Sequence, residues 1–469
     1  MFTLADILEA LTGTRPHRTS LVISEAAIDS RQVIPAAMFV ALPGERVDGH
    51  DYVGQAFDRG ANLALVQKDL SRQFPCIDVR DLSAGLTIPN SPFCLRVENT
   101  LEAMQKIAGF WRRKMDVKVI GITGSVGKST TKEVTASVLG RRYRTLKNEG
   151  NLNNEIGLPL TLLRLGKGHQ RAVLEMGFYV PGEIKFLCEL ALPSIGVVTN
   201  IGTVHAERAG SQEEIARGKA ELVESLPPEG TAILNYDDPL VRPMAEKAVA
   251  KVFYYGLDPK ANLWADQIEG MGLEGIRFRL HYHNEVLKLR VPLIGRHSVH
   301  TALRAAAVGL VDGLSWDEII NGLQKGHMQL RLVAIHTPNG ALILDDTYNA
   351  SPQSTLAALN LLAELEGKKI AVLGDMLELG QYEQKGHYMV GIRAAQVCDE
   401  LVAVGPRAKM IAEAAIGSRL SPLQVKWFET VPEVIDYLKG HLTEGDVVLL
   451  KGSHGLRMDK ITSALEEPR

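Results

Sequence analysis

The sequence has few cysteines and no long hydrophobic run. Its 469 residues contain four cysteines, Cys76, Cys94, Cys188 and Cys398, and no two of them form a Cys-x-x-Cys pair. Scattered cysteines of this kind predict free thiols in a reducing cytoplasm rather than a disulfide framework. No apolar run reaches the roughly 18 residues that a membrane-spanning helix needs. We therefore expect no membrane span.

A signal peptide and a strong charge imbalance are also missing. The first ten residues lack a basic region, and acidic residues interrupt their apolar pattern, so residues 4–11 predict a small amphipathic helix instead. The net charge is −3, which does not indicate nucleic acid as a partner. These absences favour a soluble, cytoplasmic protein.

Three segments of different texture follow one another, and we interpret them as domains 1–98, 99–327 and 328–469. The first mixes short strand-like runs, such as 37–42, with Gly- and Pro-rich turns, which predicts a small mixed α/β domain. The second and third alternate apolar strand-like runs with helical patterns. This alternation predicts a central parallel sheet and a second, Rossmann-like doubly wound unit. The expected strands are 118–123, 172–174, 195–199 and 231–234 in the middle segment, and 341–344, 370–373, 401–404 and 447–450 in the last.

A glycine-rich turn joins the predicted strand 118–123 to a helix that starts at Lys128. Its backbone amides and the positive end of that helix suit phosphate oxygens. Lys128 can bridge the β- and γ-phosphates, and the Ser129 hydroxyl can bind Mg²⁺. The residues of this phosphate loop are Thr123, Gly124, Ser125, Val126, Gly127, Lys128, Ser129 and Thr130.

The loop departs from the standard G-x-x-x-x-G-K pattern, because Ile122 stands where that pattern has its first glycine. It is the shorter T-G-x-x-G-K-S-T type. The alternative interpretation is a strand–helix turn in which the lysine is incidental. The position between a strand and a helix favours an ATP- or GTP-binding loop.

Other polar residues of the middle segment are candidates for the same site. Glu175 ends a predicted strand, where an acid can hold Mg²⁺ directly or through water; a solvated strand-end acid is the alternative. His205 follows another strand, but a lone histidine is more often structural. Lys219 lies on a predicted helix and is expected to be a solvated charge. The asparagine-rich segment 148–154 predicts either a polar binding loop or a plain connector.

In these motifs the chain resembles the Mur ligase family. T-G-S-V-G-K-S-T, E-M-G at 175–177, N-I-G-T-V-H at 200–205 and the spacing from His205 to Lys219 occur in the family's order. Segments 29–33, 39–42 and 44–51 resemble its UDP-sugar-binding domain. Segments 345–352, 373–380 and 451–453 are similar to those of the branch that adds D-alanyl-D-alanine. The Asp-Asn-Pro-Arg motif expected in the diaminopimelate- or lysine-adding relative is not found.

The resemblance implies a role for individual residues. Lys128 would contact the γ-phosphate, and Ser129 with Glu175 would bind one Mg²⁺. His205 would help to hold a second Mg²⁺, together with Lys219 carbamylated by CO₂. The positions implied for substrates are Asn153, Asn154, Tyr348 and Asn349 in the ligase site, Asp29, Ser30 and Arg31 near the UDP part, and Thr301, Arg331 and Asp346 at ATP.

Two positions depart from the family's patterns. In G-x-H-N-x-x-N, both asparagines are replaced, by Ser298 and Thr301, and the second asparagine usually contacts adenine. In D-D-x-Y-N-A-N-P, Ser351 stands where asparagine is usual. These changes concern binding detail more than the chemistry.

The function implied by the resemblance is ATP-dependent ligation of D-alanyl-D-alanine to UDP-N-acetylmuramoyl-tripeptide, with ATP and Mg²⁺ as cofactors and peptidoglycan precursor synthesis as the process. The protein would act as a monomer. A relative that adds a single amino acid, or a folate-type polyglutamate ligase, is the nearest alternative. From another class, a nucleotide-gated binding protein would bind ATP and form no amide; the second Mg²⁺ set argues against it.

Overall fold

The computed structural model describes residues 2–16, 19, 21–44, 47–81, 87–203, 206–325 and 333–466. Contacts within the chain define two compact units, which are described separately. Unit 1 comprises Met1–Gly121, Tyr143–Gly177 and Glu183–Ser194, and unit 2 comprises Ile122–Arg142, Phe178–Gly182 and Ile195–Arg469. The segment boundaries expected from sequence, at 98/99 and 327/328, stay a prediction.

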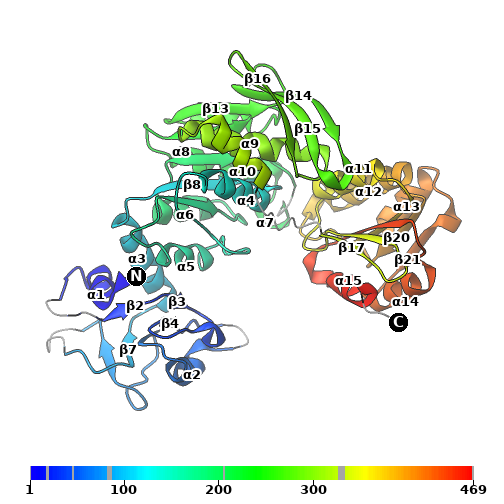
Figure 1. Cartoon of the computed structure of the whole chain (residues 1–469). Helices are drawn as coiled ribbons and strands as arrows, with labels where there is room; N and C mark the ends of the chain where they lie inside the picture. The colour runs from blue at the N-terminus through cyan, green and yellow to red at the C-terminus, as the bar shows by residue number, and fades with distance from the viewer. Residues whose placement is uncertain are drawn as a thin grey trace. The chain divides into compact units, whose positions relative to one another are not determined.

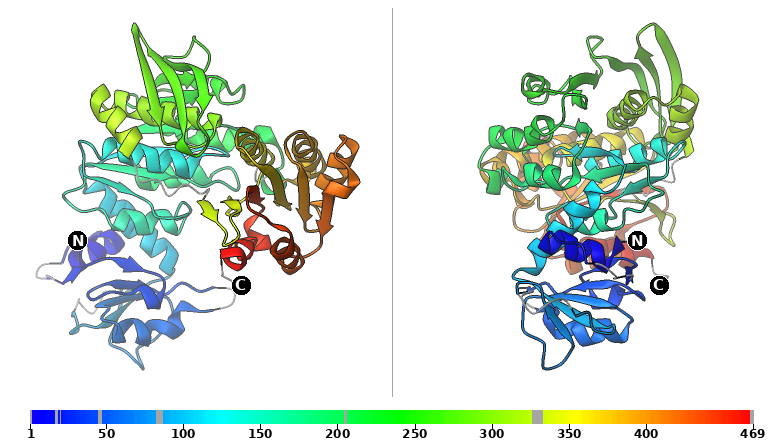
Figure 2. Two further views of the ribbon diagram at one scale, coloured as in Figure 1. Left: turned by 45° about the vertical axis from the view of Figure 1, so that its right-hand side comes forward. Right: turned by 90° about the vertical axis from the view of Figure 1, so that its left-hand side faces the viewer.

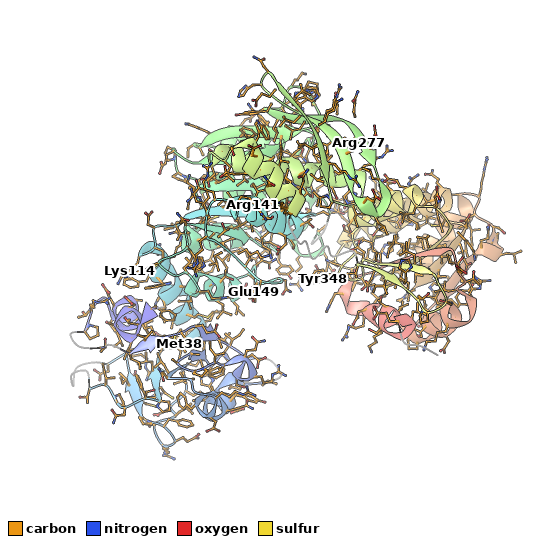
Figure 3. All side chains as sticks on the ribbon, viewed as in Figure 1. Met38, Lys114, Arg141, Glu149, Arg277 and Tyr348 are labelled. Atoms are coloured by element: carbon orange, nitrogen blue, oxygen red, sulfur yellow. The ribbon has the colours of Figure 1, made fainter. Side chains whose placement is uncertain are left out.

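The N-terminal part of unit 1 contains a five-stranded sheet whose order is β3-β4-β5-β7-β6 and whose strands are all parallel. A short antiparallel pair, β1 with β2, comes before this sheet in the sequence. Apolar side chains such as Met38 and Phe39 are buried, and Figure 3 labels Met38 within this part. The elements are β1 (Phe2–Thr3), α1 (Leu4–Thr12), β2 (Val22–Ile23), β3 (Ala26–Ala27), η1 (Ser30–Gln32), β4 (Met38–Val40), η2 (Gly49–Tyr52), α2 (Val53–Asp58), β5 (Leu63–Val66), β6 (Cys76–Asp78) and β7 (Phe93–Arg96).

The remainder of unit 1 is built on a long helix, α3 (Thr100–Arg113). Asn99 caps this helix, because its side-chain oxygen accepts from the backbone amides of Leu101 and Glu102. Helix α3 packs against the other two helices of this part. The further elements are β9 (Thr145–Lys147), α5 (Gly157–Leu163), β10 (Arg171–Glu175) and α6 (Glu183–Ala191), with β9 and β10 parallel.

The central sheet has nine strands in the order β16-β15-β14-β13-β12-β11-β8-β10-β9. Strands β11 to β14 are parallel neighbours, as the sequence predicts for this segment. In unit 2, α4 packs against α9 and α10. The elements are β8 (Lys118–Thr123), α4 (Lys128–Leu139), β11 (Ile195–Val198), α7 (Ala206–Ala209), α8 (Gln212–Glu224), β12 (Thr231–Asn235), β13 (Lys251–Gly256), β14 (Leu263–Gly270), β15 (Ile276–Tyr282), β16 (Glu285–Val291), α9 (Val299–Val311) and α10 (Trp316–Lys325).

Strands β14, β15 and β16 add an antiparallel meander to this sheet that the sequence patterns did not predict. The meander forms the bright green extension at the top of both views in Figure 2. Cross-strand ion pairs line it, for example Arg279 with Asp266 at 2.7 Å. Arg277, labelled in Figure 3, pairs in the same way with Glu269, and both of these side chains are exposed. Alternating charged and apolar residues suit a sheet with one face in water.

The last part of unit 2 is a six-stranded sheet in the order β17-β18-β22-β19-β20-β21. All neighbours are parallel except β17 with β18. Helices cover both faces, with α11, α12 and α13 on one and α14 and α15 on the other (Figure 1). This confirms the predicted doubly wound unit. The elements are β17 (Val333–His336), β18 (Leu342–Asp345), α11 (Pro352–Glu364), β19 (Lys368–Gly374), η6 (Gly380–Tyr382), α12 (Glu383–Val397), β20 (Glu400–Val404), α13 (Lys409–Gly417), β21 (Val425–Phe428), α14 (Val431–His441), β22 (Asp446–Lys451) and α15 (Asp459–Glu466).

Within the described ranges, no helix is both long enough and apolar enough to span a bilayer.

Candidate functional site

The phosphate loop lies where the sequence predicts it. Strand β8 ends at Thr123, and α4 starts at Lys128 with Gly127 as its N-cap, without a side-chain cap. The first amides of a helix lack partners within that helix and carry the positive end of its dipole. The start of α4 is therefore suited to an anion.

Two residues at the end of the neighbouring strand β11 fix the shape of the loop. The Ser125 amide donates to the Asn200 backbone carbonyl at 2.9 Å, and the Val126 amide donates to Asn200 Oδ1 at 2.9 Å. Thr199 Oγ1 and Asn200 Nδ2 donate to the Val126 carbonyl at 2.7 and 3.0 Å. The loop is thus tied to β11 by four hydrogen bonds before any ligand binds.

Both glycines of the loop are required by the backbone. Gly124 has φ +142° and Gly127 has φ +83°, conformations that L-residues rarely adopt. A Cβ on Gly124 would also lie 1.8 Å from Thr199 Oγ1. The same contact that fixes the loop therefore excludes a side chain at position 124.

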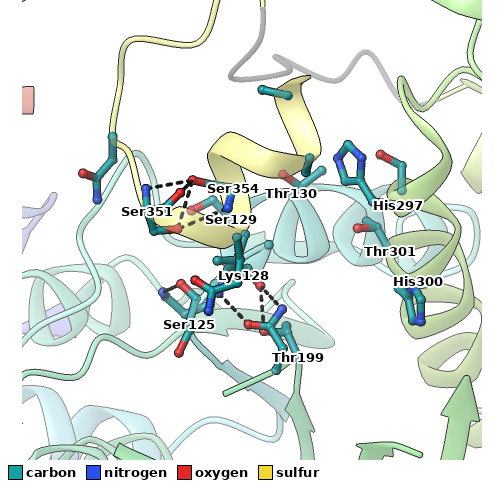
Figure 4. A pocket seen from close by; sticks show the side chains of 18 of the residues that line it. Ser125, Lys128, Ser129, Thr130, Thr199, His297, His300, Thr301, Ser351 and Ser354 are labelled. Atoms are coloured by element: carbon teal, nitrogen blue, oxygen red, sulfur yellow. Dashed lines mark hydrogen bonds between the residues drawn. The ribbon is translucent and has the colours of Figure 1, made fainter. Parts of the chain in front are cut away.

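A cavity of about 480 Å³ opens beside the loop, wholly within unit 2. Figure 4 shows Lys128, Ser129 and Thr130 on one side, His297, His300 and Thr301 on another, and Ser351 with Ser354 above. The other polar side chains that line it are Ser125, Thr199, Asn200, Asn235, Asp238, Ser298, Arg304, Asp346, Asn349, Gln353 and Lys451. Of the predicted ATP-binding residues, Ser125 to Thr130, Thr301 and Asp346 line the cavity, whereas Thr123 and Gly124 do not.

The wall of the cavity formed by α9 carries the two replaced asparagines of the family pattern. Ser298 donates its hydroxyl to the Ile294 carbonyl at 2.7 Å, which anchors the start of α9. Thr301 is 5% exposed, and its Oγ1 accepts from Arg304 Nη2 at 2.8 Å. Arg304 itself is 4% exposed. Burial lowers the pKa of this guanidinium.

The opposite wall comes from the last sheet. Lys451 ends β22, is almost fully buried, and donates from Nζ to Asp346 Oδ2 at 2.6 Å and to the Asn349 carbonyl at 2.9 Å. Ser351 caps α11 through Ser354, so the serine at this family position has a structural use. Tyr348, labelled in Figure 3, is 41% exposed on the loop after β18. It is not among the residues that line the cavity.

Lys219 is not the solvated charge expected for a lysine on a predicted helix. Its side chain is 1% exposed, and Nζ lies 4.5 Å from the centre of the Phe178 ring. Burying an ammonium group is costly unless its charge is balanced or removed. Burial therefore separates Lys219 from an ordinary surface lysine, which sequence alone did not do.

In unit 1, Glu175 ends β10 as a buried carboxylate, 2% exposed. Asn153 Nδ2 donates to Glu175 Oε1 at 2.9 Å. Asn148 pairs with the backbone of Glu175 in both directions, at 2.9 and 3.1 Å. Asn154 Oδ1 accepts from the Gly157 amide at 2.9 Å and holds the start of α5. The asparagine-rich segment is therefore an ordered connector around Glu175, with Asn148 and Asn154 in structural positions.

The residues predicted near the UDP part lie on one short helix in unit 1. Asp29 caps η1, and its carboxylate accepts from Arg31 Nε and Nη2 at 3.0 and 2.8 Å, which lowers the pKa of Asp29. Ser30 is buried and donates to Gln55 Oε1 at 2.5 Å. The Arg31 side chain is 78% exposed.

Two predicted residues, His205 and Arg331, lie outside the described residues. Among the residues that are described, no group of three or more His, Cys, Asp and Glu side chains could hold a metal ion. Of the predicted Mg²⁺ ligands, Ser129 and Lys219 are not residue types of such a group, and His205 is not described. Hydroxyl and carboxylate oxygens are the donor types that Mg²⁺ takes, so Ser129 and Glu175 fit it chemically. The Mg²⁺ set stays a prediction.

Sequence reasoning missed several residues of the cavity. Asn200 begins the N-I-G-T-V-H motif and Lys451 begins the segment 451–453, but neither was predicted to be a site residue, and both line the cavity. Asn235 ends β12 and Asp238 follows it, and polar residues at the end of a predicted strand of this sheet were a usable signal. Arg304 is a single arginine within the otherwise small or apolar stretch 302–311, and that isolation was also a signal.

Comparison with known families matches all three parts of the chain. Residues 22–89 match the model described as "Mur ligase family, catalytic domain", residues 122–309 the "Mur ligase middle domain", and residues 330–454 the "Mur ligase, glutamate ligase domain". These segments follow the order of the five-, nine- and six-stranded sheets along the chain.

Relatives of known name cover the whole chain. A protein of Bacillus subtilis (strain 168), named UDP-N-acetylmuramoyl-tripeptide–D-alanyl-D-alanine ligase, is 34% identical over an alignment of 474 positions that covers 99% of this chain and 98% of the relative. A crystal structure of MurF from Acinetobacter baumannii has a TM-score of 0.83 at 31% identity and covers 99% of this chain and 98% of that chain. MurF ligase from Thermotoga maritima in complex with ADP has a TM-score of 0.79 at 26% identity, with 96% and 98% covered.

These likenesses confirm the three-domain α/β fold and the resemblance drawn from the motifs. The ADP complex of a relative with the same fold supports the use of ATP. The activity is that of an ATP-dependent, ADP-forming ligase. The chain belongs to the Mur ligase family.

Proposed function

We propose that this enzyme joins D-alanyl-D-alanine to UDP-N-acetylmuramoyl-tripeptide and releases ADP and phosphate. The observation that carries the proposal is full-length similarity to the Bacillus subtilis ligase of that name, at 34% identity over 99% of the chain. The cavity supports it, because the phosphate loop and the Asp346–Lys451 pair line one space. A single-amino-acid ligase or a nucleotide-gated binding protein has no comparable support.

The chemistry requires activation of a carboxylate, since an oxide is a poor leaving group. The tripeptide carboxylate attacks the γ-phosphorus of ATP, the bond to the ADP oxygen breaks, and an acyl phosphate forms. The dipeptide amine then attacks the acyl carbon and loses a proton, and the tetrahedral intermediate expels phosphate. Phosphoryl transfer of this kind depends on positioning and charge neutralisation.

The chain's own groups supply much of that neutralisation. Lys128 stands at the first position of α4, where its ammonium can meet the β- and γ-phosphates alongside the helix amides. Asp346, held by Lys451, faces the same cavity and is suited to the ribose side of ATP. Thr301 on α9 provides a hydroxyl in the region proposed for adenine.

Mg²⁺ is part of the proposal as a cofactor. When bound, it would neutralise charge on the polyphosphate. Ser129 and Glu175 would hold one ion, and His205 with a carbamylated Lys219 would hold a second. The burial of Lys219 supports this role, because a carbamate would turn a buried cation into a carboxylate ligand.

The remaining assignments concern substrates and setting. Asn153, which donates to Glu175, and Asn154 would face the tripeptide. Tyr348 and Asn349 would lie around the bound substrates, and Arg331 would meet ATP. Asp29, Ser30 and Arg31 would contact the UDP part. ATP and a UDP-linked peptide are metabolites of the cytoplasm, where we place the enzyme, acting as a monomer.

The decisive experiment follows phosphate release and product mass with purified enzyme, ATP and Mg²⁺. Phosphate should appear only when UDP-N-acetylmuramoyl-tripeptide and D-alanyl-D-alanine are both present, and the product mass should equal their sum less one water. Rapid phosphate release without the dipeptide, or equal use of single amino acids, would reject the assignment.

Lys128→Ala tests the loop in the same assay. This variant should release no phosphate, because the γ-phosphoryl group loses its main side-chain cation. Arg141→Ala is the matched control, since Arg141 lies exposed just beyond the other end of α4. An active Lys128→Ala enzyme would overturn the role of the loop.

A further inference from the structure

Arg304 is a buried cation without a carboxylate partner in the described part of the chain. Its guanidinium donates from Nη2 to Thr301 Oγ1 at 2.8 Å and lies 5.8 Å from the centre of the Tyr255 ring. Its Nε is buried and makes no hydrogen bond. Isolated buried charges are strongly unfavourable, so they are usually paired. The charge of Arg304 is therefore not explained by contacts inside the folded chain.

Tyr255 does not balance this charge. Its hydroxyl points to the end of β11, within 3.0 Å of the Thr199 carbonyl and 3.2 Å of the Val198 carbonyl. Burial raises the pKa of Tyr255, so the phenol stays neutral. The neutral phenol therefore offers the guanidinium polar and cation–π contacts but no compensating negative charge.

Arg304 lies directly against the phosphate loop. A Cβ built on Gly127 would be 3.2 Å from Nη2 and 3.6 Å from Nη1. Gly127 is the N-cap of α4, which is the point where the helix presents its amides to an anion. Arg304 also lines the cavity that contains Lys128 and Ser129. The buried charge is thus separated from the phosphate position by one glycine.

We propose that Arg304 is a positioning residue for the nucleotide. Its guanidinium acts through Gly127 and favours binding of a nucleoside di- or triphosphate over binding of a nucleoside or its monophosphate, which carry less negative charge. This rests on the ATP site proposed above. In the protein interior, two opposite charges several ångströms apart attract each other far more than they do in water. The arriving phosphates supply the anion that the fold omits.

The alternative for Arg304 is a contact with the adenine base through Thr301. A base contact is uncharged, so it would contribute equally to adenosine, AMP and ADP. A phosphate-directed charge would contribute most to ADP and least to adenosine. The dependence of affinity on ligand charge therefore separates the two explanations.

The test measures the affinity of the full-length enzyme for ADP, AMP and adenosine by competition against ATP turnover, and for ADP also by calorimetry. Arg304→Met should weaken ADP by at least about tenfold and adenosine by less than about twofold, with AMP between them. The KM for ATP should rise while kcat stays within about twofold. Arg304→Lys, which keeps the charge, should recover most of the ADP affinity, and Arg141→Met should resemble the unaltered enzyme.

Stability provides the second readout. Without nucleotide, Arg304→Met should melt at the same temperature as the unaltered enzyme or higher, because an unpaired buried charge has been replaced by an apolar side chain. A purely structural arginine would show the opposite change, a lower melting temperature with or without ligand. Failure of Arg304→Met to fold would likewise assign a structural role and overturn the proposal.

Two results of the affinity measurements would contradict the proposal for Arg304. Equal losses for ADP, AMP and adenosine would assign Arg304 to the base, and an equal loss of ADP affinity in Arg304→Lys and Arg304→Met would show that charge is not the cause. Failure of the unaltered enzyme to bind ADP would instead count against the ATP site itself, independently of Arg304.

Discussion

Lys451 and Asp346 form a largely buried ion pair at the junction of two parallel strands. Lys451 Nζ lies 2.6 Å from Asp346 Oδ2, and the two side chains are 2% and 18% exposed. Lys451 is the last residue of β22 and Asp346 is the first residue after β18, and the residues just before them, Leu450 and Asp345, pair in register. This register brings the cation and the carboxylate to the same edge of the sheet and orients Asp346 toward the cavity.

Replacing Lys451 with methionine should therefore affect stability and nucleotide binding together. Asp346 would lose its charge partner, which we expect to lower the free energy of unfolding by about 2 kcal/mol. The KM for ATP should rise because Asp346 is no longer held. Urea unfolding and steady-state kinetics measure the two effects. The double variant Lys451→Met/Asp346→Asn should be less destabilised than the sum of the single variants, and simple additivity would show that the pair is not coupled.

Lys219→Ala tests the proposed carbamate. Activity should fall by at least about a hundredfold, because a ligand to the second Mg²⁺ would be lost. Short carboxylic acids added to the assay should restore part of the activity by occupying the space of the carbamate. Arg217→Ala, on the same helix α8 with a 61% exposed side chain, is the control and should be unaffected. Full activity in Lys219→Ala would eliminate the carbamate.

Gly124→Ala should disrupt the phosphate loop. The added Cβ would collide with Thr199 Oγ1 at 1.8 Å, and φ is +142°. We expect ADP binding to be lost, together with about 2 kcal/mol or more of stability, since both backbone strain and a clash are introduced. Gly313→Ala is the matched control, because Gly313 also has positive φ but meets nothing within 4 Å. A titration that finds normal ADP affinity in Gly124→Ala would contradict the geometry of the loop.

Acid should weaken unit 1 through Asp48, the N-cap of η2. The Lys68 ammonium, the His50 amide and the His50 ring hold the pKa of Asp48 well below its usual range. Since the folded state lowers this pKa, its contribution to stability is complete above about pH 4 and is lost as the pH falls further. Asp48→Asn should consequently be less stable than the unaltered enzyme at pH 7, and the gap should narrow progressively as the pH falls below about 4. Thermal unfolding across this range measures the gap; a constant difference would exclude the mechanism.

Much of the fold could be predicted because the relevant signals are local. The strand 118–123 and the start of the helix at Lys128 match the structure residue for residue, since a buried apolar run and a glycine-rich turn leave few alternatives. The meander β14–β16 was not predicted. Its strands carry charged residues on one face and depend on pairing with β13 and with one another, which a single segment of sequence does not reveal.

The candidate site shows the same limit. Motif residues such as Lys128 and Asp346 were assigned from sequence and do line the cavity. The burial of Lys219 and the position of Arg304 against Gly127 depend on side chains from other elements, Phe178 for the first and the N-cap of α4 for the second. No local pattern contains that information. The structural uses of Asn148 and Asn154 were hidden for the same reason.

The four hydrogen bonds between the phosphate loop and Thr199 and Asn200 also have a thermodynamic consequence. Fixing the backbone of one residue costs about 1–2 kcal/mol of conformational entropy, and in this chain that ordering accompanies folding. The nucleotide consequently meets a loop that is already shaped, and little of the interaction free energy is spent on ordering it. Asn200 thereby links the folding of β11 to the affinity for nucleotide, and it does so through the loop backbone, because its side-chain amide bonds to Val126.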